Sequence, residues 1–246
     1  MPATRLGKID ALATFGICDN WEFEEALLKI QPGLPIHAYD HSVSRNLFRQ
    51  QVLKEIERIG YLKPNLAKLR ARLKIYNGYK KFFSGNVTHF EERVFNRIAA
   101  PNDATLEKVF ARLPGKKNVL LKMDIEGGEY RVIPDILGYA GRIDVLLVEF
   151  HETDALRETF VNRVQALLTR FEIVHIHANN YGGVADDGLP ECLEITFLNK
   201  KFAKPGSRRA QLPLDGIDYP NDPARPDLPL IFPVEAKPRS RPLVNA

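Results

Sequence analysis

Short apolar segments alternate with helical segments along most of the chain. Six of these segments are rich in Val, Ile and Leu and end at polar residues or glycine. They cover residues 9 to 17, 35 to 40, 118 to 125, 143 to 151, 171 to 178 and 192 to 199, and a weaker strand pattern covers residues 88 to 95. Buried strands separated by helices are typical of a mostly parallel sheet covered by helices. The pattern therefore predicts an α/β fold.

Apolar residues also recur at helical spacing between these segments. The clearest stripe, at intervals of four and three residues, consists of Leu62, Leu66, Leu69, Leu73 and Tyr76. Shorter stripes contain Val52, Ile56 and Ile59, and then Leu156, Phe160, Val164 and Leu167. Such spacing places the apolar side chains on one face of a helix, so each stripe predicts a helix.

The composition changes after Phe202, because nine of the 17 prolines lie between Pro205 and Pro242. Proline removes a backbone donor and fixes φ, which excludes regular helix and central strand. We therefore predict a main domain over residues 1 to 202 and a proline-rich extension over residues 203 to 246. The extension either wraps over the domain or is disordered. Its candidate anchors are Leu212, Leu214, Ile217 and Tyr219.

The overall composition, with 44% hydrophobic and 27% charged residues in 246, is that of a soluble protein with one main domain. No segment approaches the roughly 18 apolar residues of a membrane span, and the N-terminus lacks the apolar run of a secretory signal. We therefore expect a cytoplasmic protein. Cys18 and Cys192 fit neither a disulfide framework nor a zinc site, and we expect both to be reduced.

Charge is distributed unevenly along the chain. Residues 45 to 81 contain 11 Lys and Arg against two Glu, whereas the whole chain has a net charge of only +4. A basic patch of this kind can attract an anionic partner. The alternative is a solvated face on long helices.

Ligands of open parallel sheets bind beyond the carboxyl ends of the strands, so polar residues at those ends are candidates for a site. Gly16 ends the first segment, and Asp19 or Asn20 is placed to cap the following helix. The turn has fewer glycines than a GxGxxG loop, and its acidic residues would repel a diphosphate. Asp40, at the end of the second segment, could accept hydrogen bonds from a ribose; the alternative is a turn-forming Asp.

Two further segments end in acidic residues. Asp124 and Glu126 alternate on one side of the third segment, and Glu149 and His151 share one face of the fourth. If the strands are neighbours, these side chains converge at one edge of the sheet. Like charges are costly to bury unless a ligand, cation or proton compensates, which favours a functional site over an ion-pair network with the basic helices. We expect no metal, although carboxylates of this kind could hold a divalent cation.

A third polar group lies in the stretch HIHANNYGG. His175, His177 and Asn179 share one face of the predicted strand, and Asn180 leads into a glycine loop. We predict that His177, Asn179 and Asn180 bind a substrate. The alternative is that these residues are satisfied core residues.

The stretch LLKMDIEGGEYRVIPDIL, followed by IDVLLVEFH, resembles the FkbM-like methyltransferases. The blocks FGICDNWEFEEAL, HAYDHS, HIHANN and ECLEITFLNKKF are also similar to that group, so the resemblance covers most of the chain. It implies a Rossmann-like class I methyltransferase fold, with a seven-stranded, mostly parallel sheet and an antiparallel last hairpin. It further implies S-adenosylmethionine as the methyl donor and a hydroxyl of a small molecule, such as a sugar or polyketide, as the acceptor.

The resemblance also implies roles for individual residues. The implied cofactor contacts are Phe15, Gly16, Asp19, Asp40, Ser42, Glu91, Asp124 and Glu126. Methyl transfer from a sulfonium needs an oriented acceptor oxygen and removal of its proton. His151 is the candidate base because imidazole titrates near neutral pH, and Asp124 or Glu149 either orients it or replaces it. The first motif departs from the family pattern, because Cys18, Asp19 and Asn20 stand where more glycine is usual.

Two other functions compete with this hypothesis. A nicotinamide-dependent oxidoreductase could use a similar sheet, but the chain lacks GxGxxG after the first segment. A non-catalytic, degenerate methyltransferase domain could instead bind anionic partners through residues 45 to 81. The sequence does not indicate the acceptor or the oligomeric state.

Overall fold

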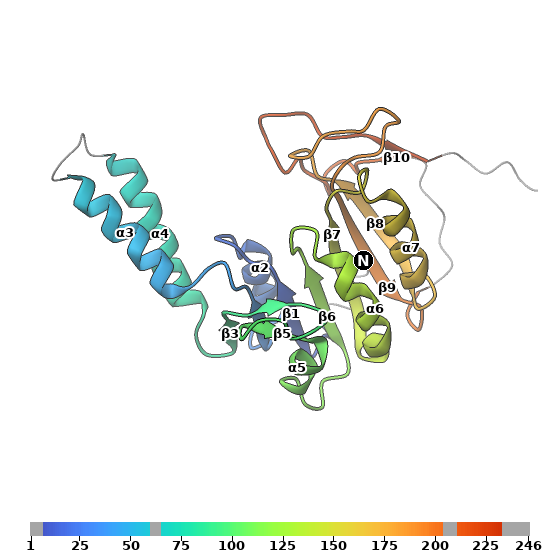
Figure 1. Ribbon diagram of the computed structural model, residues 1–246, viewed down its shortest axis with the longest axis horizontal. Helices are drawn as coiled ribbons and strands as arrows, with labels where there is room; N and C mark the ends of the chain where they lie inside the picture. The colour runs from blue at the N-terminus through green and yellow to red at the C-terminus, as the bar shows by residue number, and fades with distance from the viewer. Residues whose placement is uncertain (1–6, 60–64, 204–210, 233–246) are drawn as a thin grey trace, which may run out of the picture.

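The computed structural model describes residues 7–59, 65–203 and 211–232. Its centre is a seven-stranded sheet with the strand order β3-β2-β1-β6-β7-β9-β8 (Figure 1). The strands are β1 (Ala11–Phe15), β2 (Ile36–Tyr39), β3 (Val87–Phe90), β6 (Val119–Met123), β7 (Ile143–Phe150), β8 (Phe171–Ala178) and β9 (Leu193–Asn199). Only β9 runs against its neighbours β7 and β8. The predicted α/β class, with a mostly parallel seven-stranded sheet and an antiparallel last hairpin, is confirmed.

Helices cover both faces of the sheet. They are α2 (Glu22–Ile30), α3 (Arg45–Ile59), α4 (Leu66–Phe82), α5 (Leu106–Ala111), α6 (Glu129–Tyr139), the 3₁₀ helix η1 (Ala140–Arg142) and α7 (Arg157–Leu167). The three predicted helical stripes lie in α3, α4 and α7, although Leu62 falls outside the described residues. The weaker strand pattern becomes β3 and the short β4 (Arg93–Val94), which pairs with β5 (Asp103–Ala104) in a separate two-stranded sheet.

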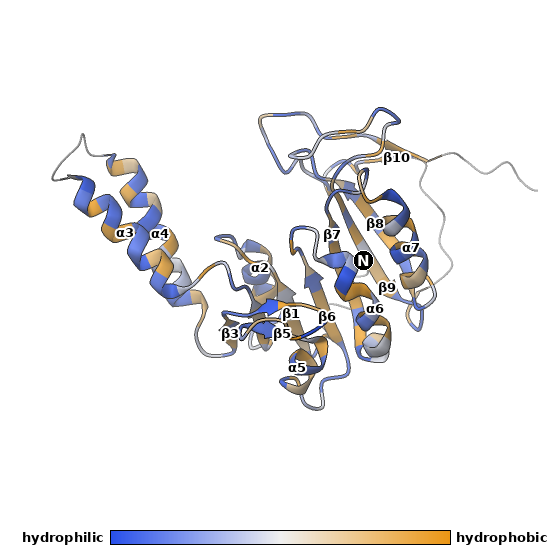
Figure 2. Cartoon of the chain, viewed as in Figure 1, coloured by the Kyte–Doolittle hydropathy of each residue, from blue (hydrophilic) through white to orange (hydrophobic). Residues whose placement is uncertain are grey.

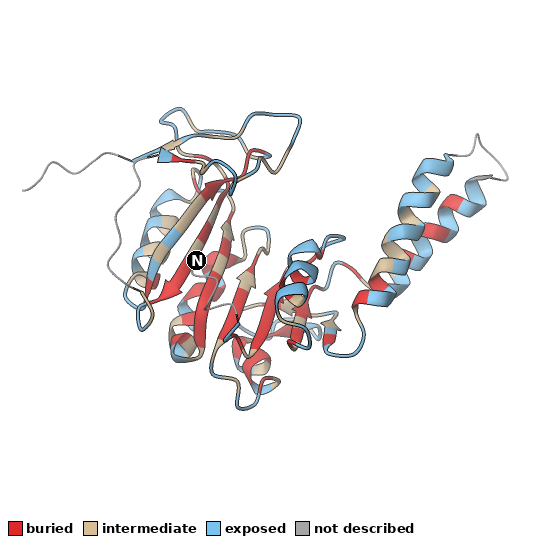
Figure 3. Cartoon of the chain, turned by 180° about the vertical axis from the view of Figure 1, so that it is seen from behind, coloured by how far each residue is buried: buried red, intermediate tan, exposed pale blue. Residues whose placement is uncertain are grey.

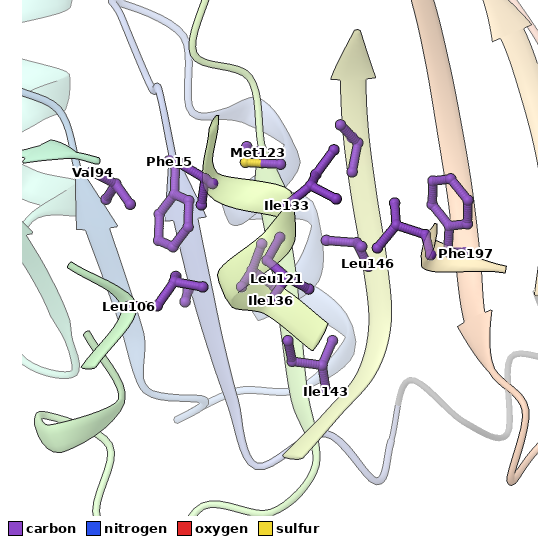
Figure 4. Packing of buried hydrophobic residues seen from close by; sticks show 14 of the residues in the cluster. Phe15, Val94, Leu106, Leu121, Met123, Ile133, Ile136, Ile143, Leu146 and Phe197 are labelled. Carbon is purple, nitrogen blue, oxygen red and sulfur yellow. The ribbon is translucent and has the colours of Figure 1, made fainter. Parts of the chain in front are cut away.

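Strands β1, β2, β6, β7 and β9 are buried along most of their length (Figure 3), whereas β3 and β8, at the two edges of the sheet, are buried only in part. Side chains alternate between the two faces of a strand, so Phe15 of β1 points to one core and Leu12 to the other. Figure 4 shows Phe15, Leu121, Ile133 and Ile136 packed between the sheet and α6. Full burial of one such side chain contributes roughly 1.5–3 kcal/mol. This packing fixes the carboxyl ends of β1, β6 and β7 relative to one another.

Helices α3 and α4 form an antiparallel hairpin, here called the arm, between β2 and β3. The arm projects from the sheet, with most of its surface exposed (Figures 1 and 3). Its base is held by the ring of Trp21, whose centroid lies 6.1 Å from those of Tyr79 and Phe82, 6.5 Å from that of Phe48 and 5.6 Å from that of Phe83. The arm is therefore anchored at one end only.

The described part of the proline-rich segment, residues 211–232, packs against β8. Its strands β10 (Gln211–Leu212) and β11 (Leu230–Ile231) pair with each other. Of the predicted apolar anchors, Leu212 is buried, but Ile217 and Tyr219 are exposed, so the prediction is wrong for those two. Polar contacts hold the segment instead, because Asp218 lies 2.7 Å from the His175 ring nitrogen and both carboxylate oxygens of Asp227 lie 3.1 Å from His177. The boundary at residue 202 stays a prediction.

Within the described residues, none of the helices is both long and apolar enough to cross a lipid bilayer. The cytoplasmic location stays a prediction.

Candidate functional site

The turn after β1 lies in backbone contact with the end of β6. Gly16 has a φ of +76°, and a Cβ atom at this position would lie 1.6 Å from the carbonyl oxygen of Asp124. The Asp124 amide donates to the Phe15 carbonyl at 2.9 Å, which joins the two loops. Only glycine combines this φ with so close an approach. The sequence placed Gly16 at a turn, and the structure shows that the turn has no room for a side chain.

Asp40 holds the other side of the same turn. Its Oδ2 accepts hydrogen bonds from the backbone amides of Ile17 and Cys18, at 3.0 and 2.9 Å. Its Oδ1 accepts from the amide and the hydroxyl of Ser42, at 2.7 and 2.6 Å. Burial acts to raise the pKa of Asp40, but these hydrogen bonds together hold the pKa below its ordinary value. Asp40 and Ser42 therefore shape the first loop, and all four acceptor positions of the carboxylate are occupied.

A cavity of about 210 Å³ lies beside this turn. It is lined by Gly16, Ile17, Cys18, Asn20, Phe23, Glu24, Lys122 and Asp124. Glu24 is buried and accepts a hydrogen bond from the Thr14 hydroxyl at 2.7 Å. The cavity thus brings an ammonium group and a carboxylate, from Lys122 and Asp124, to the glycine turn.

His151 lies at the centre of a ring of carboxylates. Its Nε2 is 3.8 Å from Asp124, 3.6 Å from Glu126 and 3.8 Å from Glu149, and its Nδ1 is 3.3 Å from Glu129. The structure therefore brings together the acidic and imidazole residues that the sequence predicted at one edge of the sheet. Among the described residues, none of the basic residues of the arm forms an ion pair with this cluster, which counts against the alternative of an ion-pair network with the basic helices.

The surroundings of the imidazole and of one carboxylate shift the pKa of each group. Burial acts to lower the pKa of His151, but the hydrogen bond with Glu129 and the surrounding negative charges raise it to about 9. Burial and the negative charge of Glu149 raise the pKa of Asp124 well above its ordinary value. This raised pKa favours the imidazolium form of His151 at neutral pH, and both ring nitrogens face carboxylate acceptors.

Helix α6 fixes the orientation of His151. Glu129, fully buried in its first turn, accepts a hydrogen bond from the Ile125 amide at 2.9 Å and contacts the imidazole Nδ1. The Tyr130 hydroxyl donates to the His151 carbonyl at 2.6 Å. Glu129 was not among the predicted site residues. The sequence shows Glu129 only as an acidic residue five positions after Asp124, at the start of a predicted helix, and this position alone does not place it at His151.

Backbone strain is concentrated at the same edge of the sheet. In the described part of the chain, the non-glycine residues with positive φ are Cys18, Glu126 and Glu152, at +44°, +54° and +54°. They follow β1, β6 and β7 respectively. Such conformations cost free energy and cluster at functional sites. This pattern marks the three loops that surround the candidate site.

Donor atoms in this cluster could also bind a cation. Side-chain donors of Asp124, Glu126 and His151 lie within 4.8 Å of one another, as do those of Glu149, His151 and Cys192. Both sets share His151. Burial, reinforced by the charge of Glu149, raises the pKa of the Cys192 thiol. The expectation of no metal stays a prediction.

The three predicted substrate-binding residues have different environments. Asn179 donates to Glu149 at 2.7 Å and so borders the cluster. His177 lies between the carboxylates of Glu194 and Asp227, and its pKa rises to about 9, chiefly through the hydrogen bond with Glu194. Asn180 bonds to the backbone of residues 222, 225 and 226. The polar atoms of His177 and Asn180 hold the C-terminal segment, and their substrate contacts stay a prediction.

The remaining predicted cofactor contacts, Phe15, Asp19 and Glu91, are not among the residues that line the cavity. Phe15 is fully buried and packs edge to face with Tyr39 in the core, directly before the turn at Gly16. Asp19 and Glu91 are exposed. The predicted cap role of Asp19 or Asn20 is wrong, because the N-cap residue of α2 is Trp21 and, among the described residues, no side chain caps this helix. The Asn20 side chain instead accepts a hydrogen bond from the Glu22 amide at 3.0 Å, just before the helix.

His89 links the arm to the first loop. Its Nε2 lies 3.0 Å from the Asp40 carbonyl and its Nδ1 lies 2.6 Å from the Tyr79 hydroxyl. A carbonyl only accepts, so Nε2 donates and Nδ1 accepts from the tyrosine. Burial lowers the pKa of His89 and keeps the ring neutral.

Comparisons with known proteins give distant structural likenesses. No family model matches the chain, and no curated protein matches it. A Pyrococcus horikoshii protein named as a candidate RNA methyltransferase aligns over 82% of this chain and 80% of its own, at 12% identity and a TM-score of 0.40. Precorrin-6y C5,15-methyltransferase from Geobacter metallireducens covers 80% of this chain and 87% of its own, at 16% identity and a TM-score of 0.37.

The fibrillarin pre-rRNA processing protein of Methanococcus jannaschii covers 80% of this chain and 69% of its own, at 8% identity and a TM-score of 0.40. Likenesses this distant identify no substrate for this chain. The resemblance to the FkbM-like methyltransferases therefore stays a prediction.

Proposed function

We propose that this protein is an S-adenosylmethionine-dependent methyltransferase of the FkbM-like type that acts on a hydroxyl of a small molecule. One observation carries the proposal. Asp124 lines the cavity at the glycine turn and also lies 3.8 Å from His151. A donor bound in the cavity and an acceptor bound at His151 would therefore meet at one carboxylate.

The polar groups at the cavity suit the ends of this cofactor. The methionine part carries an ammonium and a carboxylate, which complement Asp124 and Lys122. The sulfonium is a cation without phosphate, and the site offers carboxylates and no multi-glycine phosphate loop. Asp40 would contact the ribose only by releasing one of its four hydrogen bonds, of which the one from the Ser42 hydroxyl is the most easily rotated away.

The cofactor supplies an electrophilic methyl group, so the protein must orient the acceptor oxygen and remove its proton. Glu129 holds Nδ1 of His151, which directs Nε2 toward Asp124, Glu126 and Glu149. A pKa of about 9 favours the imidazolium form of His151 at neutral pH, and an imidazolium cannot accept a proton. The positive sulfonium, if held beside these carboxylates, would lower the pKa of the imidazole and so make Nε2 available as the base. Asp124, whose own pKa is raised, is the alternative acceptor of the proton.

The proposal is tested by separating cofactor binding from methyl transfer. Calorimetry should detect binding of S-adenosylhomocysteine by the wild type and by His151→Gln with similar affinity. Methyl transfer from labelled cofactor to a panel of hydroxyl acceptors should fall in the variant by roughly 10²–10⁴. His175→Gln is the matched control, because His175 pairs with Asp218 and lies outside the carboxylate ring.

The assignment of the base and the assignment of the cofactor can each be contradicted by one result. Near wild-type methylation by His151→Gln removes His151 as the base. A wild-type protein that binds NADH and not S-adenosylhomocysteine would instead be assigned to the oxidoreductases, the other catalytic prediction from the sequence.

A further inference from the structure

The arm carries a dense, exposed positive charge. Its described helices contain ten Lys and Arg against Glu55 and Glu57. Of these ten basic residues, only Arg58 and Lys68 form ion pairs within the described structure, and both pair with Glu55. The eight other basic residues are Arg45, Arg49, Lys54, Arg70, Arg72, Lys74, Lys80 and Lys81. The arm therefore presents a strong positive field on a projecting element, which favours an anionic partner.

The arm also exposes large apolar side chains. Leu53, Ile56, Leu66 and Leu73 are 43%, 47%, 53% and 36% exposed. Leu53 and Ile56 are three residues apart and Leu66 and Leu73 are seven apart, so each pair lies on one face of its helix. Single exposed apolar residues are ordinary, whereas exposed apolar residues gathered on one projecting element are a feature of interaction sites. Hydrophobic and hydrophilic residues alternate along the arm in Figure 2.

Other side chains contribute to the contact between the two helices. Val52, Phe48 and Tyr79 are buried, and at the base the rings of Phe48 and Tyr79 are 5.3 Å apart. The solvent-exposed part of each Leu and Ile side chain remains available to a partner.

We propose that the arm binds the surface of an anionic lipid bilayer, with its cations at the headgroups and its exposed Leu and Ile side chains at the boundary of the acyl chains. Basic helices with aligned apolar residues bind such surfaces through both interactions. A nucleic acid would account for the cations and not for the exposed apolar residues. A second copy of the arm would bring two strongly positive surfaces together. The proposal does not depend on the methyl-transfer function.

The geometry of the arm suits this role. Helix α4 has 17 residues, which corresponds to a length of about 25 Å at 1.5 Å per residue. The arm stands clear of the sheet and is fixed only at its base (Figure 1), so it can lie along a flat surface without moving the core. Because the hydrogen bonds of Tyr79 and His89 connect this base to Asp40, a docked arm would also hold the first loop of the candidate site near the bilayer.

Vesicle binding of the full chain tests the proposal. Co-sedimentation should detect binding to vesicles of phosphatidylglycerol and phosphatidylcholine in equal amounts, and none to phosphatidylcholine alone. The double variant Arg70→Glu/Lys74→Glu should weaken binding at least about tenfold, since each basic residue near an anionic surface contributes substantially. Leu53→Gln/Leu66→Gln should weaken it by roughly fivefold or more, because less apolar surface is buried.

The matched control changes the same kinds of side chain outside the arm. Lys29→Glu/Ile30→Gln, at the end of α2, replaces an exposed cation and a 59% exposed isoleucine, and should bind within about twofold of the wild type if the arm is the surface. Circular dichroism should show that all variants remain folded, as the replaced side chains are exposed.

Three results would overturn the proposal. The first is that the wild type does not bind anionic vesicles. The second is that the apolar variant binds them as well as the wild type, which would leave only non-specific charge attraction. The third is binding to an RNA oligonucleotide that the charge variant loses and the apolar variant keeps, without vesicle binding, which would identify a nucleic acid as the partner.

Discussion

The carboxyl edge of the sheet and the arm both concentrate charge, but they do so in opposite ways. At the edge, four carboxylates lie 3.3 to 3.8 Å from one imidazole that is only 19% exposed. On the arm, eight basic side chains have no ion-pair partner among the described residues. Charges in water are screened within about 10 Å, whereas partly buried charges act strongly on one another. The carboxylates at the edge can therefore shift the pKa of His151, whereas the exposed cations of the arm produce a positive potential that would attract an anionic partner.

The two regions also differ in the conformation of their backbones. The loops at the edge contain Gly16, Cys18 and Glu126 at positive φ, with the first turn pressed against Asp124. The arm consists of two regular helices joined at one end by an aromatic cluster. Strain and close approach fix atoms in place, as a reactive site requires, whereas regular exposed helices tolerate change. The comparison predicts large effects of small substitutions at the edge and small effects on the arm.

The largest effect is expected for Gly16→Ala. The new Cβ would collide with the Asp124 carbonyl, and alanine disfavours a φ of +76°. We expect a loss of about 3 kcal/mol in the free energy of unfolding, from backbone strain and overpacking together. Urea denaturation measures this loss, and calorimetry should show that S-adenosylhomocysteine binding is lost as well.

Gly85→Ala is the control for this substitution. Gly85, at the base of the arm, has a φ of +64°, but a Cβ atom added there would meet no other atom within 4 Å. It should cost about 1 kcal/mol, the penalty of the backbone conformation alone. If the two variants are equally stable, the tight contact between the first turn and Asp124 does not exist in solution.

A smaller effect is expected for Glu129→Gln. This change removes a buried negative charge at His151 Nδ1, so the pKa of His151 should fall from about 9 toward 6.5. Proton NMR of the imidazole measures the pKa directly. The activity profile should follow it, because kcat/KM rises with pH as the free protein loses this proton, and the rise should move to lower pH in the variant.

The stability of the folded protein should also depend on the protonation of His151. The folded-state pKa of His151 is raised, so its stabilising contribution is complete below pH 6.5 and is lost as the pH rises through 9. Glu129→Gln should therefore lose less stability than the wild type between these values. Glu126→Gln is the control, since its side chain is 87% exposed and solvent screens its charge. An unchanged His151 pKa in Glu129→Gln would show that Glu129 does not position the ring.

The smallest effect is expected for neutral substitutions on the arm. Arg70→Gln/Lys74→Gln removes two exposed cations without ion-pair partners in the described structure, so the free energy of unfolding should change by less than about 0.5 kcal/mol. Urea denaturation at low and high salt measures this change. Glu55→Gln should cost more, about 1 kcal/mol, because Glu55 is buried and pairs with Arg58 and Lys68. If both variants lose the same free energy of unfolding, the exposed cations of the arm contribute to its stability.

Much of the fold could be predicted from hydrophobic spacing. The six strong strand segments all form strands, and the helical stripes lie in helices, because burial in a two-sided sheet demands apolar residues at fixed periods. Hydrophobic spacing did not predict correctly which residues of the helices are buried. Leu66 and Leu73 fit the stripe of α4 but remain exposed. Period indicates which residues share a face, and it does not say whether another element covers that face.

The candidate site was predictable only in part. Asp124, Glu149 and His151 could be expected to converge, since the carboxyl ends of adjacent parallel strands share an edge. The role of Glu129 could not be derived in this way, because it depends on the angle at which α6 leaves the turn at Gly127 and Gly128. His177 and Asn180 contact residues more than 40 positions later in the chain, and no local pattern reports such a contact.

The amino-acid sequence by itself determined the α/β class, the glycine at the first turn and the excess of positive charge between residues 45 and 81, since periodicity, chirality and charge are local properties. The tertiary structure decided which charges meet. It placed four carboxylates around His151. It also directed backbone amides of the first loop to the Asp40 carboxylate and kept the cations of the arm away from the carboxylates at the edge of the sheet. The strength of an electrostatic interaction depends on distance and burial, and both exist only once the strands and loops are packed together.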